Sequence, residues 1–357
     1  MNDAEQALQY PFGQDVPGLA QVIDIAPSLR WVRMPLPFAL DHINLWLIRD
    51  EQDGQPGWAV VDCGVAQPVV QQAWERLFEE ALDGLPVLRV IVTHMHPDHI
   101  GNADWLVQRW STPERPCRLW ISATDFAAAT NACRSTTGFG GKPAAAFFAS
   151  HGLTDPEAVA KVEARSGYYR SMVPAVPAQH RRLMDGQRLV IGPHEWRCIV
   201  GHGHAPEHIA LFCEDLQVLI SGDMVLPRIS TNVSVIDLEP EANPLALYLR
   251  SLARYRDLPE DTLVLPSHGR PFRGLHTRID QLEAHHEARL SDVLGACREQ
   301  PCSAASLLPL LFRRPLDVHT TTFAMGEAIA HLHALWFDGR ISRSRREDGV
   351  WVFQAMG

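Results

Sequence analysis

The sequence contains neither a paired-cysteine motif nor a long apolar run. Its seven cysteines are odd in number and scattered, with no C-x-x-C pair, so we expect reduced and mostly buried thiols. No apolar run reaches the roughly 18 residues that span a membrane, and the first residues, MNDAEQALQYPFG, lack the basic and apolar parts of a signal peptide. These absences predict a cytoplasmic protein without a membrane partner.

A surplus of positive charge is also absent. The formal net charge is −10, which makes nucleic acid an unlikely partner, although a local basic groove is compatible with this balance. Apolar residues make up 46% and charged residues 21%, as in globular proteins. The 357 residues exceed the roughly 250–300 at which single cores tend to split, so we expect one large domain and one smaller domain.

Strand-like and helical segments alternate through the first 300 residues. The runs RWVRMPL, INLWLIRD and WAVVDCG predict strands, residues 67–82 have helical apolar spacing, and LRVIVTH returns as an aliphatic strand. Residues from about 123 to 180 are Ala-rich and predict a helical insertion. A second set of strands follows at QRLVIG, EWRCIVG, HIALFCED, LQVLISGD and DTLVLPSHG, and helices are expected near 244–256 and 275–298. The pattern indicates an α/β (α+β) domain over residues 1–300.

The segment 301–357 reads as a separate unit. Apolar residues recur with helical spacing and end at a glycine: Met325, Ile329, Leu332, Trp336 and Gly339. The following RREDGVWVF has an Asp-Gly turn leading into a strand, so the segment resembles a winged helix. Winged helices often bind nucleic acid, but six arginines against five acidic residues leave a balance of only +1 here. We therefore expect this segment to have a structural or dimerising role, with a second copy of the chain as its partner in a homodimer.

One short loop, VTHMHPDHIGN, collects four metal-binding side chains directly after an aliphatic strand. His94 and His96 are two residues apart on extended chain, so both imidazoles project to the same side. Pro97 then turns the chain, and Asp98 and His99 leave the turn together toward a neighbouring position. This density of ligands favours a metal site over a solvated loop.

Further ligands follow later strands, in GHGHAPEH, ISGD and LPSHG. Together with the H-x-H-x-D-H loop, they make the sequence resemble the metallo-β-lactamase fold superfamily over about residues 31–273. The resemblance implies an αββα sandwich, with the 301–357 module similar to one appended to some hydrolases of this superfamily. Aligning HAPEH with the family's HTPGH implies that His204, rather than His202 or His208, is a ligand.

The resemblance implies a dinuclear metal site with seven ligands. His94, His96 and His204 would hold the first metal, Asp98, His99 and His268 the second, and Asp223 would bridge them. Two Zn²⁺ ions are favoured by this mixture of imidazole and carboxylate, and iron or manganese is compatible with it. The implied chemistry is hydrolysis by a metal-bound hydroxide, formed from bound water; Asp98 would orient this hydroxide and move its proton.

The resemblance leaves the substrate open. A small acyl thioester or ester is the first hypothesis, because members similar to glyoxalase II share the ligand set; a lactone, a β-lactam and an RNA phosphodiester are alternatives. His94, His204 and Asp223 alone would also suit a mononuclear iron persulfide dioxygenase. Residues expected to border the substrate are His42, Tyr168, Tyr169, Arg228 and Asn232.

Overall fold

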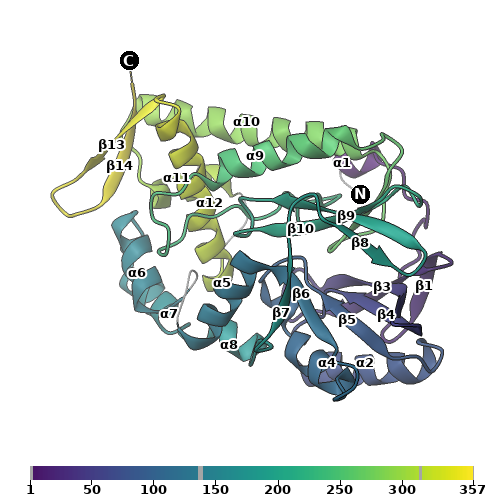
Figure 1. Cartoon of the computed structure of the whole chain (residues 1–357). Helices are drawn as coiled ribbons and strands as arrows, with labels where there is room; N and C mark the ends of the chain where they lie inside the picture. The colour runs from purple at the N-terminus through teal and green to yellow at the C-terminus, as the bar shows by residue number, and fades with distance from the viewer. Residues whose placement is uncertain (1–2, 136–139, 313–315, 357) are drawn as a thin grey trace. The chain divides into compact units, whose positions relative to one another are not determined.

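The computed structural model describes residues 3–135, 140–312 and 316–356 (Figure 1). The chain forms two compact units that interleave along the sequence. The first comprises Met1–Arg134, Tyr169–Thr231 and Leu252–Ile279, and the second Ser135–Tyr168, Asn232–Ser251 and Asp280–Gly357. The division into domains at residue 300, expected from the sequence, remains a prediction.

The first unit contains a seven-stranded sheet whose strands lie in chain order. The strands are β1 (Val22–Ala26), β2 (Leu29–Pro35), β3 (His42–Gln52), β4 (Gln55–Val61), β5 (Val87–Ile91), β6 (Arg118–Ser122) and β7 (His180–Leu183). Strands β1 to β4 pair antiparallel, whereas β4 to β7 pair parallel. The parallel half requires crossover connections, and helix α2 (Pro68–Glu80) supplies the one between β4 and β5.

A second, five-stranded sheet completes the first unit. Its strands are β8 (Arg188–Ile191), β9 (His194–Gly201), β10 (His208–Cys213), β11 (Val218–Gly222) and β12 (Leu263–Pro266). The spatial order is β12-β11-β10-β9-β8, with β11 and β12 parallel and the other pairs antiparallel. Both sheets are therefore mixed, and the predicted strands of the second half are all present.

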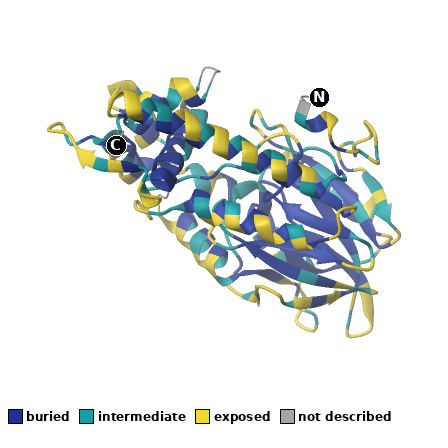
Figure 2. Cartoon of the chain, turned by 90° about the horizontal axis from the view of Figure 1, so that it is seen from above, coloured by how far each residue is buried: buried dark blue, intermediate teal, exposed yellow. Residues whose placement is uncertain are grey.

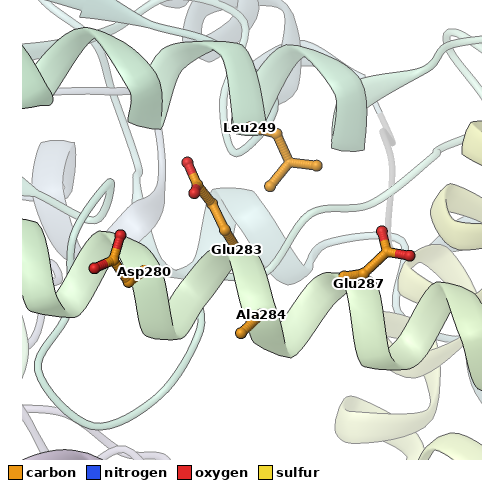
Figure 3. Close-up of a pocket in the computed structure, with 5 residues that line it drawn as sticks. All are labelled: Leu249, Asp280, Glu283, Ala284 and Glu287. Carbon is orange, nitrogen blue, oxygen red and sulfur yellow. The ribbon is translucent and has the colours of Figure 1, made fainter.

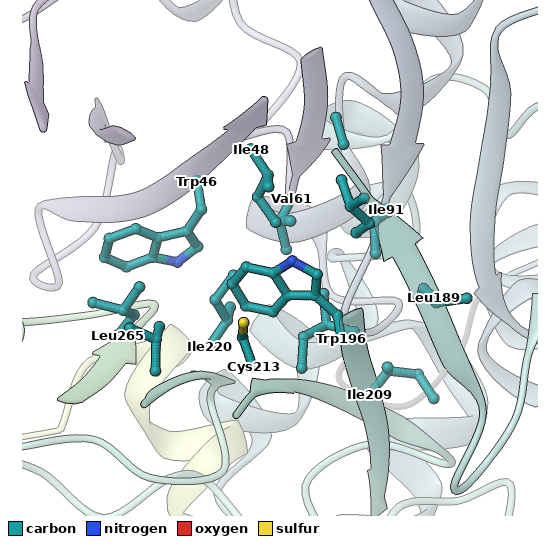
Figure 4. Packing of buried hydrophobic residues seen from close by; sticks show 14 of the residues in the cluster. Trp46, Ile48, Val61, Ile91, Leu189, Trp196, Ile209, Cys213, Ile220 and Leu265 are labelled. Carbon is teal, nitrogen blue, oxygen red and sulfur yellow. The ribbon is translucent and has the colours of Figure 1, made fainter. Parts of the chain in front are cut away.

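The two sheets enclose a continuous apolar core (Figure 4). Alternate residues of each strand point into it, so Trp46 and Val61 of the first sheet lie in the same cluster as Trp196 and Ile220 of the second. Fully burying one aliphatic side chain such as Val61 or Ile220 contributes about 1.5–3 kcal/mol. The core therefore determines which face of each sheet is turned toward the other sheet. Helix α2 buries an apolar stripe of its own, made of Val70, Ala73, Trp74, Leu77 and Phe78.

Helices occupy the remaining segments. They are α1 (Asp3–Gln6), α3 (Pro97–Ile100), α4 (Ala103–Trp110), α5 (Ala123–Arg134), α6 (Gly141–Ser150), α7 (Pro156–Glu163), α8 (Tyr168–Met172), α9 (Pro244–Arg254), α10 (Leu275–Glu299), α11 (Ala304–Leu311) and α12 (Val318–Phe337). Helices α5 to α8 fall in the segment for which the sequence predicts helices. Helix α7 begins as expected, because the Asp155 side chain accepts a hydrogen bond from Ala158 N and proline follows at the first helical position.

The C-terminal segment consists of α11, α12 and a hairpin of β13 (Ile341–Arg345) and β14 (Trp351–Ala355). Ser303 caps α11 in a reciprocal capping box with Ser306. Gly339 follows α12 with φ of +69°, the left-handed conformation that ends helices. The fold is thus an α/β sandwich of two mixed sheets with a C-terminal helical region and a small hairpin; the finer description as a winged helix stays a prediction.

Burial follows this architecture. Buried residues concentrate in the strands, and exposed residues lie on loops and on the outer faces of helices (Figure 2). Within the described ranges, every helix is too short or too polar to cross a membrane.

Candidate metal centre

The predicted ligands follow strands whose ends meet at one edge of the sandwich. Strands β9 and β11 both run antiparallel to β10, and β12 runs parallel to β11, so these three strands point the same way. His204 follows β9, Asp223 follows β11 and His268 follows β12. Ile209 N donates to Thr93 O at 2.8 Å, which places the end of β5 beside the start of β10. The His94–His99 loop therefore meets the other three ligands.

Three histidines form a first cluster. Nδ1 of His96 lies 2.9 Å from Nε2 of His94 and 3.1 Å from Nε2 of His204, and the last two atoms are 3.1 Å apart. The three ring nitrogens point toward one common position, where a metal ion could accept all three lone pairs. This arrangement is suited to a metal ion that takes nitrogen ligands.

Asp98, His99 and His268 form a second cluster. Oδ2 of Asp98 lies 3.6 Å from Nε2 of His99 and 3.4 Å from Nε2 of His268. The Asp223 carboxylate reaches both clusters: its Oδ1 is 3.5 Å from Nε2 of His99 and 3.4 Å from that of His268, and its Oδ2 is 3.3 Å from Nε2 of His204. The His and Asp side chains thus form two adjoining clusters suited to a dinuclear metal site.

The donor atoms fit metal ions. Nε2 of His99 and Oδ1 of Asp223 are buried without a hydrogen-bond partner in the described part of the chain. Burial and the adjacent His204 ring lower the pKa of His96 to about 3, which keeps its ligand lone pair free at neutral pH. Burial alone would lower the pKa of His268, but the Asp223 and Asp98 carboxylates raise it to about 10. The second cluster therefore attracts positive charge.

Side chains behind the clusters orient the rings. Nδ1 of His99 donates to Oδ2 of Asp62 at 2.8 Å, and Nδ1 of His204 is hydrogen-bonded to the Thr231 hydroxyl at 2.8 Å. Nδ1 of His268 donates to the His42 carbonyl at 2.8 Å. Each contact occupies Nδ1 and turns Nε2 toward the clusters, which fixes the ligand tautomer.

Asp62 and Thr231 were missed by the sequence interpretation. Asp62 directly follows β4, the parallel neighbour of β5, and a polar residue after a buried strand is the signal that could have identified it. Its carboxylate also accepts from the backbone N and hydroxyl of Thr93. Its φ of 62° is a left-handed conformation that aspartate tolerates better than most residues.

Gly222 and His208 position Asp223 from the other side. A Cβ on Gly222 would lie 2.2 Å from Nε2 of His208, so only glycine fits there. Asp223 N donates to that Nε2 at 3.1 Å. His208 thus supports the backbone at Asp223, whereas Nδ1 of His202 lies 2.8 Å from the Pro206 carbonyl.

Asp125, in the first turn of α5, links the two ligand loops of the first cluster. Its Oδ1 accepts from Met95 N at 2.8 Å and its Oδ2 from Glu207 N at 2.6 Å. The residue is fully buried, and burial raises its pKa to about 6 against the opposing effect of these backbone donors. Tyr169 adds a second contact to the first loop, because its hydroxyl donates to the Met95 carbonyl at 2.6 Å.

The residues expected to border the substrate lie in different places. His42 and Arg228 line a cavity that also contains His268. The Tyr169 hydroxyl donates a hydrogen bond to the Met95 carbonyl, as described above. Tyr168 and Asn232 belong to the second unit, where Tyr168 packs on the Arg165 guanidinium and Asn232 accepts from the Ser234 hydroxyl.

A second group of carboxylates lies elsewhere, in a groove of about 440 Å³ between α9 and α10 (Figure 3). Asp280, Glu283 and Glu287 line it together with Leu249 and Ala284. Among the described residues, the groupings that could hold a metal ion all lie at the sandwich edge, not in this groove.

Comparisons with known proteins agree with this geometry. The metallo-β-lactamase superfamily matches residues 39–126 and 144–268, and the metallo-β-lactamase-like C-terminal domain matches residues 290–356. The crystal structure of a β-lactamase domain protein from Burkholderia ambifaria is 53% identical, with a TM-score of 0.94 over 99% of this chain and 100% of that one.

Two curated proteins are also similar. The probable metallo-hydrolase YqjP of Bacillus subtilis (strain 168) is 24% identical over 317 residues, which cover 85% of this chain and 91% of that protein. A hydroxyacylglutathione hydrolase of Chromohalobacter salexigens is 40% identical over 78 residues, 22% of this chain and 27% of that protein. The family predicted from the ligand pattern is confirmed: the chain belongs to the metallo-β-lactamase superfamily and carries its C-terminal β-lactamase-like domain.

Proposed function

We propose that the protein is a dinuclear metallo-hydrolase that cleaves a small acyl thioester or ester. The observation that carries this proposal is the position of Asp223, whose two carboxylate oxygens face the two clusters at 3.3–3.5 Å. A hydrolase is supported by the similarity to a probable metallo-hydrolase along most of the chain. A thioester is supported by the local similarity to a hydroxyacylglutathione hydrolase, because an acylglutathione is a thioester.

The proposed ligands are those of the two clusters, with His94, His96 and His204 in the first and Asp98, His99 and His268 in the second. Zinc is the proposed metal because the donors combine imidazole and carboxylate. When bound, the ions would polarise the substrate carbonyl and lower the pKa of water toward 7.

Asp98 is the proposed proton carrier. Its side chain is 18% exposed, so it reaches the open side of the clusters while one oxygen faces His99 and His268. Burial raises the pKa of Asp98, but these two rings outweigh burial and hold it at about 2, so the carboxylate is ionised at neutral pH. It would accept a proton from the attacking water and pass it to the leaving group.

A structural rather than nucleic-acid-binding role is proposed for the C-terminal winged-helix-like segment. The arginines of its hairpin are engaged within the second unit: Arg343 pairs with Glu241 at 2.7 Å and lies between the Trp336 and Trp351 rings, and Arg346 pairs with Asp348. Arginines held in this way contribute little to a free basic surface. Small-molecule hydrolysis is therefore favoured over RNA cleavage.

The test is a substrate panel run together with elemental analysis of the same sample. We expect turnover of a thioester or ester that changes little between low and physiological salt and is lost in His96→Ala. Salt-sensitive, metal-dependent cleavage of single-stranded RNA without turnover of any acyl compound would contradict the proposal. A single bound iron with oxygen uptake on a persulfide would replace it by the dioxygenase alternative.

A further inference from the structure

A cavity of about 540 Å³ in the first unit adjoins the second metal-ligand cluster. His268 and His42 form part of its wall, so one end of the cavity meets the side chains proposed to hold the second metal. The rest of the wall comes from Glu5 of α1, residues 14 and 16, Arg33 of β2, the loop before β3, the 226–229 loop after Asp223 and the residues directly after His268. A group bound in this cavity would lie beside the reacting centre.

Three arginines line this cavity: Arg33, Arg228 and Arg270. The acidic residues in the wall are Glu5 and Asp41, and Asp41 is paired with Nδ1 of His42 at 2.6 Å. The wall is thus locally basic in a chain with a net charge of −10. A wall with this excess of arginine is suited to an anionic ligand.

Arg33 and Arg270 are held in place by neutral groups, and their positive charges repel each other. Arg33 donates to the Gly269 carbonyl at 2.5 Å and to Oδ1 of Asn44 at 3.1 Å, whereas Arg270 lies over the Tyr10 ring at 4.3 Å. Burial, against the opposing Asp41 carboxylate and with a smaller contribution from Arg270, lowers the pKa of Arg33 to about 10. Asp41 is the carboxylate that opposes this repulsion, and the hydrogen-bond and ring partners of the two arginines are neutral. A bound anion would therefore further reduce the repulsion between the two guanidinium groups.

Arg228 is the adaptable member of the three. Its side chain is 71% exposed, and its ion pair with Glu5 spans 3.9 Å. The loop that carries it is fixed, because the buried Arg278 donates to the carbonyl groups of Leu226 at 2.6 Å and Ile229 at 2.9 Å. A rigid loop with a mobile guanidinium at its tip can close on a carboxylate or phosphate.

We propose that this cavity binds an anionic group, carboxylate or phosphate, of the molecule that is hydrolysed at the adjoining clusters. The proposal rests on the proposed function for its chemistry and narrows the substrate to an anionic acyl compound. Two sources share the required charge: a carboxylate on the acyl part, or a phosphate on the thiol or alcohol part.

The test compares substrate pairs that differ only in this charge. The 3-carboxypropionyl and butanoyl thioesters of N-acetylcysteamine carry the acyl carboxylate and its neutral counterpart. Acetyl-4′-phosphopantetheine and acetylpantetheine differ in the phosphate of the thiol. We expect one anionic member to have a KM at least tenfold below its neutral partner, and the pair in which this occurs identifies the source of the anion.

Arg228→Gln should raise KM for that anionic substrate about tenfold, leave kcat unchanged and leave the neutral substrate unaffected. Arg188→Gln is the matched control, because Arg188 is an exposed arginine of β8 paired with Glu195. Equal KM values for charged and neutral partners, unchanged by Arg228→Gln, would overturn the proposal and leave the hydrolase function standing.

Calorimetry separates failure of this proposal from failure of the proposed function. Succinate and inorganic phosphate are titrated into the wild-type protein and into Arg228→Gln. Binding that weakens in the variant supports the anion site even if no thioester or ester is turned over. Absence of binding by either anion, together with no preference for charged substrates, would overturn it.

Discussion

The Oδ2 atom of Asp62 lies 2.8 Å from Nδ1 of His99, and this contact turns Nε2 of His99 toward Asp98 and Asp223. Both members of the pair are fully buried, since their side chains are 1% and 0% exposed. The second cluster therefore depends on a carboxylate that does not itself face it.

Asp62→Asn should weaken metal binding at the second cluster by about 10–100-fold, the usual cost of losing such an orienting partner. Chelator competition measures the affinity. Asp50→Asn is the control, because Asp50 is an equally buried carboxylate of the same unit, paired with Arg89 at 2.7 and 2.9 Å. It should lower the melting temperature without altering metal affinity; equal losses in both variants would show a general effect of destabilisation.

Metal content should follow the division into two clusters. The wild-type protein is expected to bind about two transition-metal ions per chain. Asp223→Ala should reduce both, because its oxygens face both clusters, whereas His268→Ala should empty only the second. Elemental analysis after gel filtration gives the stoichiometry, with His202→Ala as a control in the same loop as His204. Two retained ions in His268→Ala would remove that residue from the ligand set.

Asp98→Asn should lower kcat by at least about 10²-fold, the lower end of the effect of losing general acid–base catalysis. The amide keeps the size of the carboxylate but cannot accept the proton. Steady-state rates should be measured on samples with known metal content, since Asp98 also belongs to the second cluster. Near-normal kcat with both metals bound would exclude a role in proton transfer.

Asp125→Asn should disturb the first cluster through the backbone. The amide nitrogen would face one of two backbone N–H donors, at Met95 or Glu207, and a buried donor without an acceptor costs about 1–3 kcal/mol. We expect a lower melting temperature and weaker metal binding by His94, His96 and His204. Ser122→Ala removes only the 3.3 Å contact to Asp125 and should have a smaller effect. Unchanged metal affinity in Asp125→Asn would contradict the role.

Glu327 on α12 should make stability depend on pH. Burial raises the pKa of its carboxyl from 4.5 to about 7, against the opposing charge of Arg289. The folded protein therefore holds this proton more tightly than the unfolded chain, and stability falls as pH rises from about 4.5 through 7. Glu327→Gln should stabilise the protein by about 1–3 kcal/mol at pH 8 and by little at pH 4. Thermal melts at both pH values measure the difference, and an equal effect at both would rule out titration of Glu327.

The sequence determined the elements whose side chains have a strong local period. Strands β2 to β5 and β8 to β12 were predicted from apolar runs, and α2, α9, α10 and α12 from helical spacing; these elements are confirmed. Strand β7 was missed because its sequence, HRRL, is polar. Its place is decided by pairing with β6 and by Arg181 lying over the Trp120 ring at 4.4 Å.

Local order also determined the first half of the candidate site. His94, His96, Asp98 and His99 are neighbours in the chain, so the extended run and the turn at Pro97 were enough to group them. The family follows from the same residues together with later strand ends. The resemblance selected His204 over His202 and His208. The tertiary structure adds the contact itself, because the pairing of β9 with β10 brings Nε2 of His204 to 3.1 Å from Nε2 of His94.

The orienting residues and the arginine-lined cavity were likewise decided by the tertiary structure. Asp62, Thr231 and Arg270 lie far from the His94–His99 loop in sequence, and the sequence interpretation did not group them with it. They reach the sandwich edge because β4 runs parallel to β5, and β12 parallel to β11, so that the ends of distant strands meet. Strand order comes from the packing of two sheets around one core, a sum over many distant contacts that no local segment contains.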